Sequence, residues 1–356
     1  MRKTVFYSLL VCFFYVVCQT ASAQKHPKNV VFLIGDGMGI AQVYAGMVAN
    51  GNKLNLEQCT YSGFSKTYSF DKFTTDSGAG GTALACGVKT RNGMIGMSAD
   101  SVAVQSVLEL SSHNKLSTGI VVACAVTHAT PASFIAHQIN RSMYYEIAAD
   151  YLKTDIDVFI GGGRKYFEDR EDGRNLTNEL KAKGYQIAYK LADVKSAKTG
   201  KLAGLLYDDQ NPNMPERGAM LPDATMAAIN ILDDNKKGFF LMVEGSQIDW
   251  AGHDNNARQV VKEMLDFDQT IGRVLDFAKK DGNTLVIITA DHETGGLTLP
   301  SGKFGSDDMK AIFTTKDHTG VPVPVFAYGP GAENFTGFME NTSFKAKLEK
   351  LLKLKK

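Results

Sequence analysis

The feature that most constrains this chain is a series of short apolar runs, rich in β-branched residues, that end in glycine or in acidic residues. Polar and apolar positions do not alternate within these runs. A strand with one face in water would alternate, so the pattern is typical of strands buried on both faces of a largely parallel sheet. The expected strands cover residues 29–34, 119–123, 157–160, 239–243, 284–288 and 324–327.

Helical patterns lie between these runs. Across residues 257–280, apolar residues such as Val261, Leu265 and Ile271 recur at helical spacing. Strands and helices therefore alternate along the chain. This alternation predicts an α/β fold, a three-layer sandwich with a largely parallel central sheet.

The length of 356 residues allows two domains or one large domain with insertions. Residues 191–223 and 295–317 are rich in Lys, Asp, Asn, Pro and Gly, and we interpret both as short surface insertions. We therefore predict a single domain over residues 24–356. Residues 344–356 have an amphipathic, basic pattern that favours a terminal helix docked on this domain.

The first 23 residues have the pattern of a secretory signal. Arg2 and Lys3 precede an apolar run over residues 5–17, and a small-residue cleavage site ends at Ala23. The run is shorter than the ~20 residues that span a membrane. The pattern predicts cleavage and export, to the periplasm or out of the cell, and no later segment is apolar enough to form a span.

The charge and the cysteine content exclude some classes of function and of metal site. With 39 Lys+Arg against 38 Asp+Glu, no bulk positive field attracts a polyanion, so nucleic-acid binding is not expected. Two of the five cysteines leave with the signal, and Cys59, Cys86 and Cys124 remain outside any CxxC or Cys/His pattern. We expect these three cysteines to be small buried side chains. One disulfide between two of them remains possible, which would leave one free thiol. Any bound metal would then be held by oxygen and imidazole.

Carboxylates and imidazoles follow several of the predicted strands. Asp36, Glu244, Asp249 and Asp291 come after three different runs, and the carboxyl ends of parallel strands meet at one edge of a sheet. Carboxylates gathered there would raise one another's pKa and destabilise the fold unless cations neutralised them. A single Asp after a strand is often only a helix cap, but several together predict a metal site.

The spacing of the histidines supports this prediction. Asp249 and His253 are four residues apart, on one side of a helical turn, and His292 directly follows Asp291. His128 and His318 also lie in loops beside such groups. The remaining histidines, His26, His113 and His137, have no such neighbours and are expected to be ordinary surface or core residues.

A candidate nucleophile is Ser77, which precedes a Gly/Ala-rich stretch that predicts a closely packed helix. The helix N-terminus would favour an anion there, and a nearby metal could hold the serine as an alkoxide. The alternative is a plain serine N-cap. Residues 161–164, Gly-Gly-Gly-Arg, lack the spacing of a phosphate-binding loop and predict only a tight turn.

Six separate motifs, in order over roughly residues 28–332, together resemble the alkaline phosphatases. They are GDGMG with Asp36, TTDSGAGGTA with Ser77, HATPAS followed by Arg141, VEGSQIDWAGH, TADHETGG and DHTGVPVPVFAYGPGA. The resemblance implies the alkaline-phosphatase type of α/β sandwich and two Zn²⁺ ions and one Mg²⁺ per chain. It also implies a homodimer and phosphate monoesters as substrates.

The same resemblance implies a role for each residue. The first zinc would be held by Asp249, His253 and His318, the second by Asp36, Ser77, Asp291 and His292, and Mg²⁺ by Asp36, Thr130 and Glu244, with His128 beside it. Ser77 would form a phosphoserine that water then hydrolyses, and Arg141 would grip two phosphate oxygens. Trp250 and His128 would also contact the substrate.

Two positions differ from the most familiar bacterial enzyme, which has Asp where this chain has His128 and Lys where it has Trp250. Other family members carry His and Trp there. Imidazole is a poorer partner for hydrated Mg²⁺ than a carboxylate.

Two other functions are weighed against this one. A diesterase, sulfatase-like or mutase relative usually lacks the Mg²⁺ ligands, so the presence of Thr130 and Glu244 argues against such a relative. An exported phosphate-binding protein without turnover would not need Ser77 among metal ligands.

Overall fold

The computed structural model describes residues 26–306 and 308–356. The predicted signal over residues 1–23 lies outside this part of the chain. The central feature is a ten-stranded sheet in the order β14-β2-β13-β8-β1-β7-β3-β4-β6-β5. Its strands are β1 (Asn29–Gly35), β2 (Tyr61–Lys66), β3 (Ser117–Ala125), β4 (Val158–Gly162), β5 (Tyr185–Ala188), β6 (Lys201–Leu205), β7 (Phe239–Gly245), β8 (Thr284–Thr289), β13 (Val323–Tyr328) and β14 (Gly337–Glu340).

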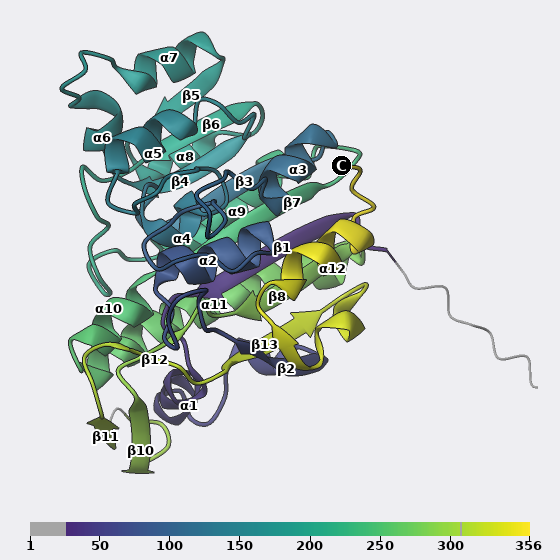
Figure 1. The fold of residues 1–356 in the computed structure, drawn as a ribbon. Helices are drawn as coiled ribbons and strands as arrows, with labels where there is room; N and C mark the ends of the chain where they lie inside the picture. The colour runs from purple at the N-terminus through teal and green to yellow at the C-terminus, as the bar shows by residue number, and fades with distance from the viewer. Residues whose placement is uncertain (1–25, 307) are drawn as a thin grey trace, which may run out of the picture.

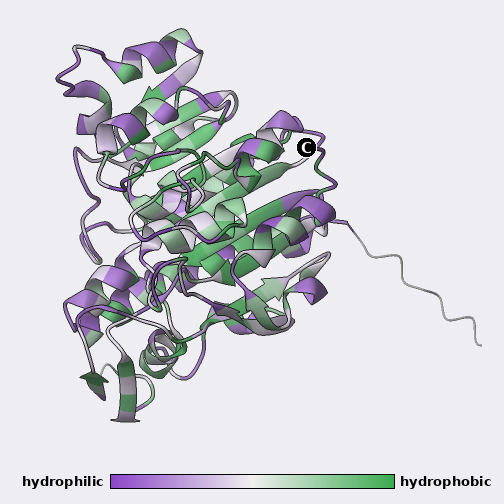
Figure 2. Cartoon of the chain, viewed as in Figure 1, coloured by the Kyte–Doolittle hydropathy of each residue, from purple (hydrophilic) through white to green (hydrophobic). Residues whose placement is uncertain are grey.

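The sheet is largely parallel, as the apolar runs predicted. Strand β1 pairs in parallel with β7 and β8, and the parallel pairing continues through β3, β4, β6 and β5. Only β13 runs antiparallel to its neighbours β2 and β8. Figure 2 shows the central strands as the most hydrophobic part of the fold, because they are covered on both faces.

Helices cover both faces and make three layers (Figure 1). On β1, Val30, Phe32 and Ile34 pack into one core and Val31 and Leu33 into a second core on the other face. The helices are α1 (Ile40–Ala49), α2 (Ser77–Cys86), α3 (Val107–His113), α4 (Ala129–Ala132), α5 (Tyr144–Asp150), α6 (Arg164–Glu168), α7 (Leu176–Ala182), α8 (Leu191–Ser196), α9 (Met220–Leu232), α10 (Gln247–His253), α11 (Ala257–Asp281) and α12 (Ser343–Leu351).

The first core lies under α2, α3, α5 and α12, and the second under α1, α9 and α11. The predicted helix over residues 257–280 is therefore confirmed as α11. The terminal helix is confirmed as α12, which docks through Phe344, Leu348 and Leu351. Within the described residues, no helix is long and apolar enough to cross a membrane.

The interpretation of residues 191–223 as a surface insertion was wrong. This segment supplies α8, the first residues of α9, and β6, which pairs with β4 and β5 inside the main sheet. Leu202, Ala203 and Leu205 of β6 are buried. Charged neighbours on both sides conceal this short strand in the sequence.

Residues 295–317 do lie outside the main sheet. They contain the antiparallel hairpin of β10 (Leu297–Gly302) and β11 (Met309–Phe313), which projects at the lower left of Figure 1. The short strands β9 (Glu293–Thr294) and β12 (His318–Thr319) pair at its base. This pairing fixes His318 close to His292 although 25 residues separate them in the chain.

Candidate metal centre

The candidate site lies where the parallel strands end. In the register of the sheet, Gly35 of β1 is level with Gly245 of β7, and Ile34 with Thr289 of β8, so Asp36 emerges at the same edge as the segments that follow β7 and β8. Gly37 has φ of +72° and lies so close to Asp249 that a Cβ atom would be 2.7 Å from its Cα. Glycine at this position therefore lets the loop after β1 pack against α10.

The first group of ligands consists of Asp249, His253 and His318. Nε2 of each imidazole lies 3.4 Å from a carboxylate oxygen of Asp249. The other ring nitrogens lie against backbone carbonyls, Nδ1 of His318 at 2.9 Å from Thr75 O and Nδ1 of His253 beside Lys316 O. Hydrogen bonds of this kind fix the tautomer of a metal-binding histidine and leave Nε2 as the free donor.

The two Nε2 atoms of His253 and His318 are only 3.1 Å apart. If both rings are neutral with the proton on Nδ1, two lone pairs face each other, and either a proton on one Nε2 or a metal ion between the two makes the contact favourable. The Asp249 carboxylate raises the pKa of His253 to about 9, because it stabilises the charged ring. The geometry therefore fits a metal ion bound by two imidazoles and one carboxylate.

The second group surrounds His292, which is fully buried. Its Nε2 lies 3.4 Å from Asp36 Oδ1, 3.2 Å from Asp291 Oδ2 and 3.2 Å from the Ser77 hydroxyl. Thr294 Oγ1 lies 3.2 Å from the opposite ring nitrogen. Asp36 Oδ1 and Asp291 Oδ2 have no hydrogen-bond partner in the part of the chain that the structure describes.

Charge repulsion at this edge is visible in the carboxyl groups. Burial, together with the charges of Asp291, Asp249 and Glu244, raises the pKa of Asp36 well above its usual range. Burial also raises the pKa of Glu244 to about 7. The predicted convergence of these carboxylates is confirmed. Without a cation Asp36 and Glu244 favour their neutral forms, whereas the neighbouring histidines lower the pKa of Asp249 and of Asp291.

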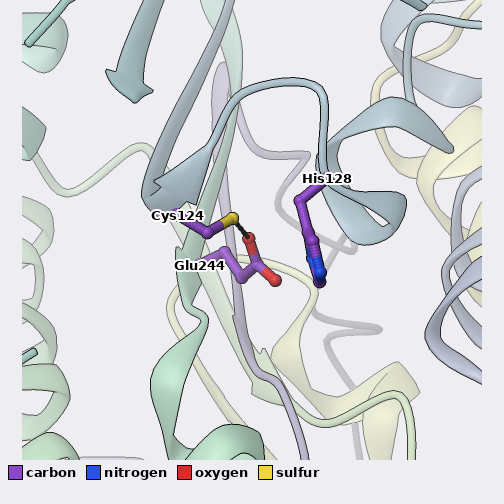
Figure 3. A group of neighbouring side chains, drawn as sticks. All are labelled: Cys124, His128 and Glu244. Carbon is purple, nitrogen blue, oxygen red and sulfur yellow. Dashed lines mark hydrogen bonds between the residues drawn. The ribbon is translucent and has the colours of Figure 1, made fainter. Parts of the chain in front are cut away.

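The third group is Cys124, His128 and Glu244, whose donor atoms all lie within 4.8 Å of one another (Figure 3). Cys124 Sγ is 3.4 Å from Glu244 Oε2. Thr130 lies next to this group and its hydroxyl donates to Asp36 Oδ2 at 3.2 Å. Burial lowers the pKa of His128 to about 4, so this ring is a neutral donor. The sequence predicts only oxygen and imidazole as metal ligands, so Cys124 is a candidate ligand that it did not predict.

Ser77 is the first residue of α2, and the alternative of a plain serine N-cap was wrong. Asp76 is the N-cap, because its Oδ1 accepts from the backbone N–H of Ala79 at 2.9 Å. The Ser77 hydroxyl is therefore free to face His292. Gly80 in the next turn lies against Asp291, where a Cβ atom would be 3.1 Å from the aspartate Cβ, so small residues bring α2 close to the ligands.

A cavity of about 460 Å³ opens in front of Ser77. Arg141 lines it and donates from Nη1 to Asp76 Oδ2 at 3.0 Å, so the N-cap of α2 also orients this guanidinium. Trp250 and His128 form part of the wall, with their rings packed edge to face at 5.8 Å. The predicted substrate-contacting residues are thus together on one cavity.

Three residues that the sequence did not single out support the site: Asp76, Thr294 and Cys124. Thr294 hydrogen-bonds both to Asp249 Oδ1 and to Nδ1 of His292, and so links the first two groups. In the sequence, a threonine two residues after a histidine ligand does not by itself indicate a role in a metal site. The three histidines set aside lie elsewhere: His137 bonds Glu109, His113 bonds Gln105 and His26 bonds Leu351 O.

Known proteins are similar to this chain over almost its whole length. The family model described as alkaline phosphatase matches residues 27–312 and 307–354. "Alkaline phosphatase 4" of Bacillus subtilis is 36% identical, over 94% of this chain and 92% of that relative. The chain belongs to the alkaline phosphatase family. As a member of the alkaline phosphatase family it is a metal-binding enzyme that hydrolyses phosphate monoesters.

Solved alkaline phosphatases share the fold. The enzyme from the Antarctic bacterium TAB5 superimposes with a TM-score of 0.88 at 43% identity, over 93% of this chain and 100% of that one. The Thermus thermophilus enzyme gives 0.84 at 23% identity, over 93% and 92% of the two chains, which supports the fold alone. A variant of the TAB5 enzyme, with one histidine replaced by aspartate, has Mg bound in its M3 site.

Proposed function

We propose that Ser77 is the nucleophile of this phosphatase, and that it forms a phosphoserine at a centre for two zinc ions and a third divalent cation. The observation that carries the proposal is the position of its hydroxyl, at the N-terminus of α2 and 3.2 Å from His292 Nε2. Beside it lie buried oxygen atoms that have no hydrogen-bond partner among residues 26–306 and 308–356. Metal-assisted nucleophilic catalysis requires a hydroxyl held in this way.

The donor atoms fit this set of ions. Imidazole and carboxylate ligands suit zinc, and Asp36 Oδ1, Asp291 Oδ2 and Glu244 Oε1 are buried oxygens that a cation would satisfy. Zinc, when bound, lowers the pKa of a coordinated hydroxyl and stabilises a departing alkoxide oxygen. The first zinc would be held by Asp249, His253 and His318, the second by Asp36, Ser77, Asp291 and His292, and the third cation, Mg²⁺ by the family resemblance, by Asp36, His128, Thr130 and Glu244.

The chain's own residues bind and orient the phosphate. Ser77 Oγ attacks phosphorus in line, the ester P–O bond breaks, and the alcohol leaves; water later cleaves the phosphoserine. The backbone N–H that follows Ser77, that of Gly78, would hold a phosphate oxygen at the N-terminus of α2, while the N–H of Ala79 is bonded to Asp76. Arg141 holds two of these oxygens, with Asp76 fixing its guanidinium from behind. His128 and Trp250 form the wall that contacts the substrate.

Replacing Arg141 with Ala should raise the KM for a monoester and the Ki for phosphate by ~10–100-fold, the effect of losing a charged, bidentate contact. Arg141→Lys should restore only part of this loss, because an ammonium cannot make the paired contact. Steady-state kinetics and zinc analysis measure both effects, with the exposed Arg174→Ala as the control. Zinc loss in Arg141→Ala would show that Arg141 is structural.

The proposal as a whole is tested by the hydrolysis of a nitrophenyl phosphate monoester and of the matching diester, with Zn²⁺ and Mg²⁺ supplied and a chelator control. We expect rapid monoester turnover that the chelator stops, with little diester activity. Preference for the diester would favour a phosphodiesterase, and saturable phosphate binding without product would favour a binding protein. Either outcome would overturn the proposed reaction.

We further propose that residues 1–23 are removed on export to the periplasm or out of the cell, and that residues 24–356 act as a single domain in a homodimer. The signal-like sequence and the family resemblance support these proposals. N-terminal sequencing of the exported protein should begin at Gln24. Sedimentation should give twice the mass of one chain, and a monomer would contradict the assembly.

A further inference from the structure

Cys124 occupies an unusual position for a buried thiol. It lies on β3, fully buried, while Glu244 lies on the adjacent strand β7, where it is in register with Val122. Its Sγ atom is 3.3 Å from the backbone carbonyl of Ala125 and 3.4 Å from Glu244 Oε2, and it is a free cysteine in the structure. The thiol is therefore in direct contact with a buried carboxylate on the neighbouring strand.

The carboxylate itself needs a further partner. Glu244 is fully buried, and its Oε1 has no hydrogen bond among the described residues. Nδ1 of His128 also lacks a partner, and Figure 3 shows the glutamate carboxylate between the thiol and this ring. A buried carboxylate with an unsatisfied oxygen is costly, and a cation shared with the neighbouring donors would remove that cost.

We infer that Cys124 is a ligand of the third cation site, and that it makes this site select a thiophilic ion such as Zn²⁺ over Mg²⁺. The inference rests on the third site of the proposed function and revises the ion in it. Cysteine and imidazole are zinc ligands, whereas Mg²⁺ requires an octahedron of oxygens. With Mg²⁺ in this site the sulfur would remain an uncoordinated core side chain.

The distances suit the proposed ion. In a tetrahedral zinc site with the usual Zn–S and Zn–O lengths, sulfur and oxygen lie about 3.5 Å apart. The separation of Cys124 Sγ and Glu244 Oε2 is 3.4 Å. Binding replaces the thiol proton with the metal, so one proton goes to solvent for each ion that enters the site.

The chain offers a matched control in Cys86. This cysteine is also buried and also contacts a backbone carbonyl, that of Ser133 at 3.7 Å, but among the described residues its Sγ is bonded to no carboxylate. Cys86→Ser and Cys124→Ser thus make the same chemical change in the core. Only the second removes a proposed ligand.

The test uses the chelator-stripped chain titrated with Co²⁺ in excess Mg²⁺, followed through the thiolate-to-cobalt charge-transfer absorption. We expect this band in the unchanged protein and in Cys86→Ser, and its loss in Cys124→Ser. After loading with Zn²⁺ and excess Mg²⁺, metal analysis should give three zinc ions per chain in the first two proteins and two in Cys124→Ser. No band in the unchanged protein, or three zinc ions in Cys124→Ser, would overturn the inference.

If Cys124→Ser does not fold, X-ray absorption at the zinc edge of the unchanged protein decides. A sulfur neighbour at about 2.3 Å is expected, and a shell of nitrogen and oxygen alone would contradict the inference. Neither measurement uses turnover. If the sulfur is bound to the metal but no monoester is hydrolysed, the result would count against the proposed reaction. The inference that Cys124 is a ligand would still stand.

Discussion

Replacement of Ser77 with Ala is expected to abolish the phosphoenzyme and to lower kcat by on the order of 10⁴-fold or more, while zinc content stays nearly unchanged. The hydroxyl is the proposed attacking group, and no other hydroxyl lies within hydrogen-bond distance of His292 Nε2 in the described residues. Metal binding should survive because Asp36, Asp291 and His292 remain. Their positions come from strand ends and not from α2.

The measurement combines steady-state kinetics with mass spectrometry of protein quenched in acid during turnover. The unchanged protein should carry one phosphate on the peptide that contains Ser77. Ser111→Ala is the matched control, since Ser111 is a buried helical serine whose hydroxyl bonds only its own helix, at Val107 O. Covalent phosphate trapped in Ser77→Ala would refute the assignment of the nucleophile.

Much of this site was predictable because its information is local. Asp36, Asp291 and His292 directly follow apolar strands, and parallel strands must bring such positions to one edge. Asp249 and His253 share a helical turn, which their spacing alone reveals. Metal binding then followed from the repulsion among the carboxylates and not from any single residue.

The missed features depend on contacts between distant segments. Strand β6 has a short apolar run between charged neighbours, and its pairing with β4 and β5 decides its conformation. The sequence indicates only a plain core residue at Cys124, because the carboxylate that it contacts, Glu244, is 120 positions away. Asp76 gave a clear capping pattern only once the start of α2 was known, and its contact with Arg141 belongs to the tertiary fold.

Removal of the metal ions should make the protein less stable, and the loss should grow as the pH rises from about 4.5 to 9. In the metal-free fold, burial raises the pKa of Glu244 from 4.5 to about 7, so between these values the folded state holds a proton that the unfolded state has lost. Stability therefore falls with rising pH in that window, by ~3 kcal/mol for this group alone.

Two other groups set the pH range over which the metal-free protein loses stability. The raised pKa of His253, about 9, adds stability that is complete below pH 6.5 and is lost as the pH rises through 9. The hydrogen bonds from His253 and His318 lower the pKa of Asp249, so its contribution is lost only in acid. Bound cations reverse the fall in stability that Glu244 causes, because they bind the ionised carboxylates and stabilise the folded state.

Thermal unfolding with and without chelator, at several values between about pH 5 and 9, measures this difference. The gap in Tm between the metal-loaded and chelated protein should widen with pH, and Glu244→Gln should flatten the pH slope of the chelated protein, since the amide keeps the shape but cannot ionise. A chelated protein whose Tm stays level or rises over this range would contradict the prediction. The carboxylates that follow the strands would then be satisfied by the fold itself, and repulsion among them would no longer argue for metal.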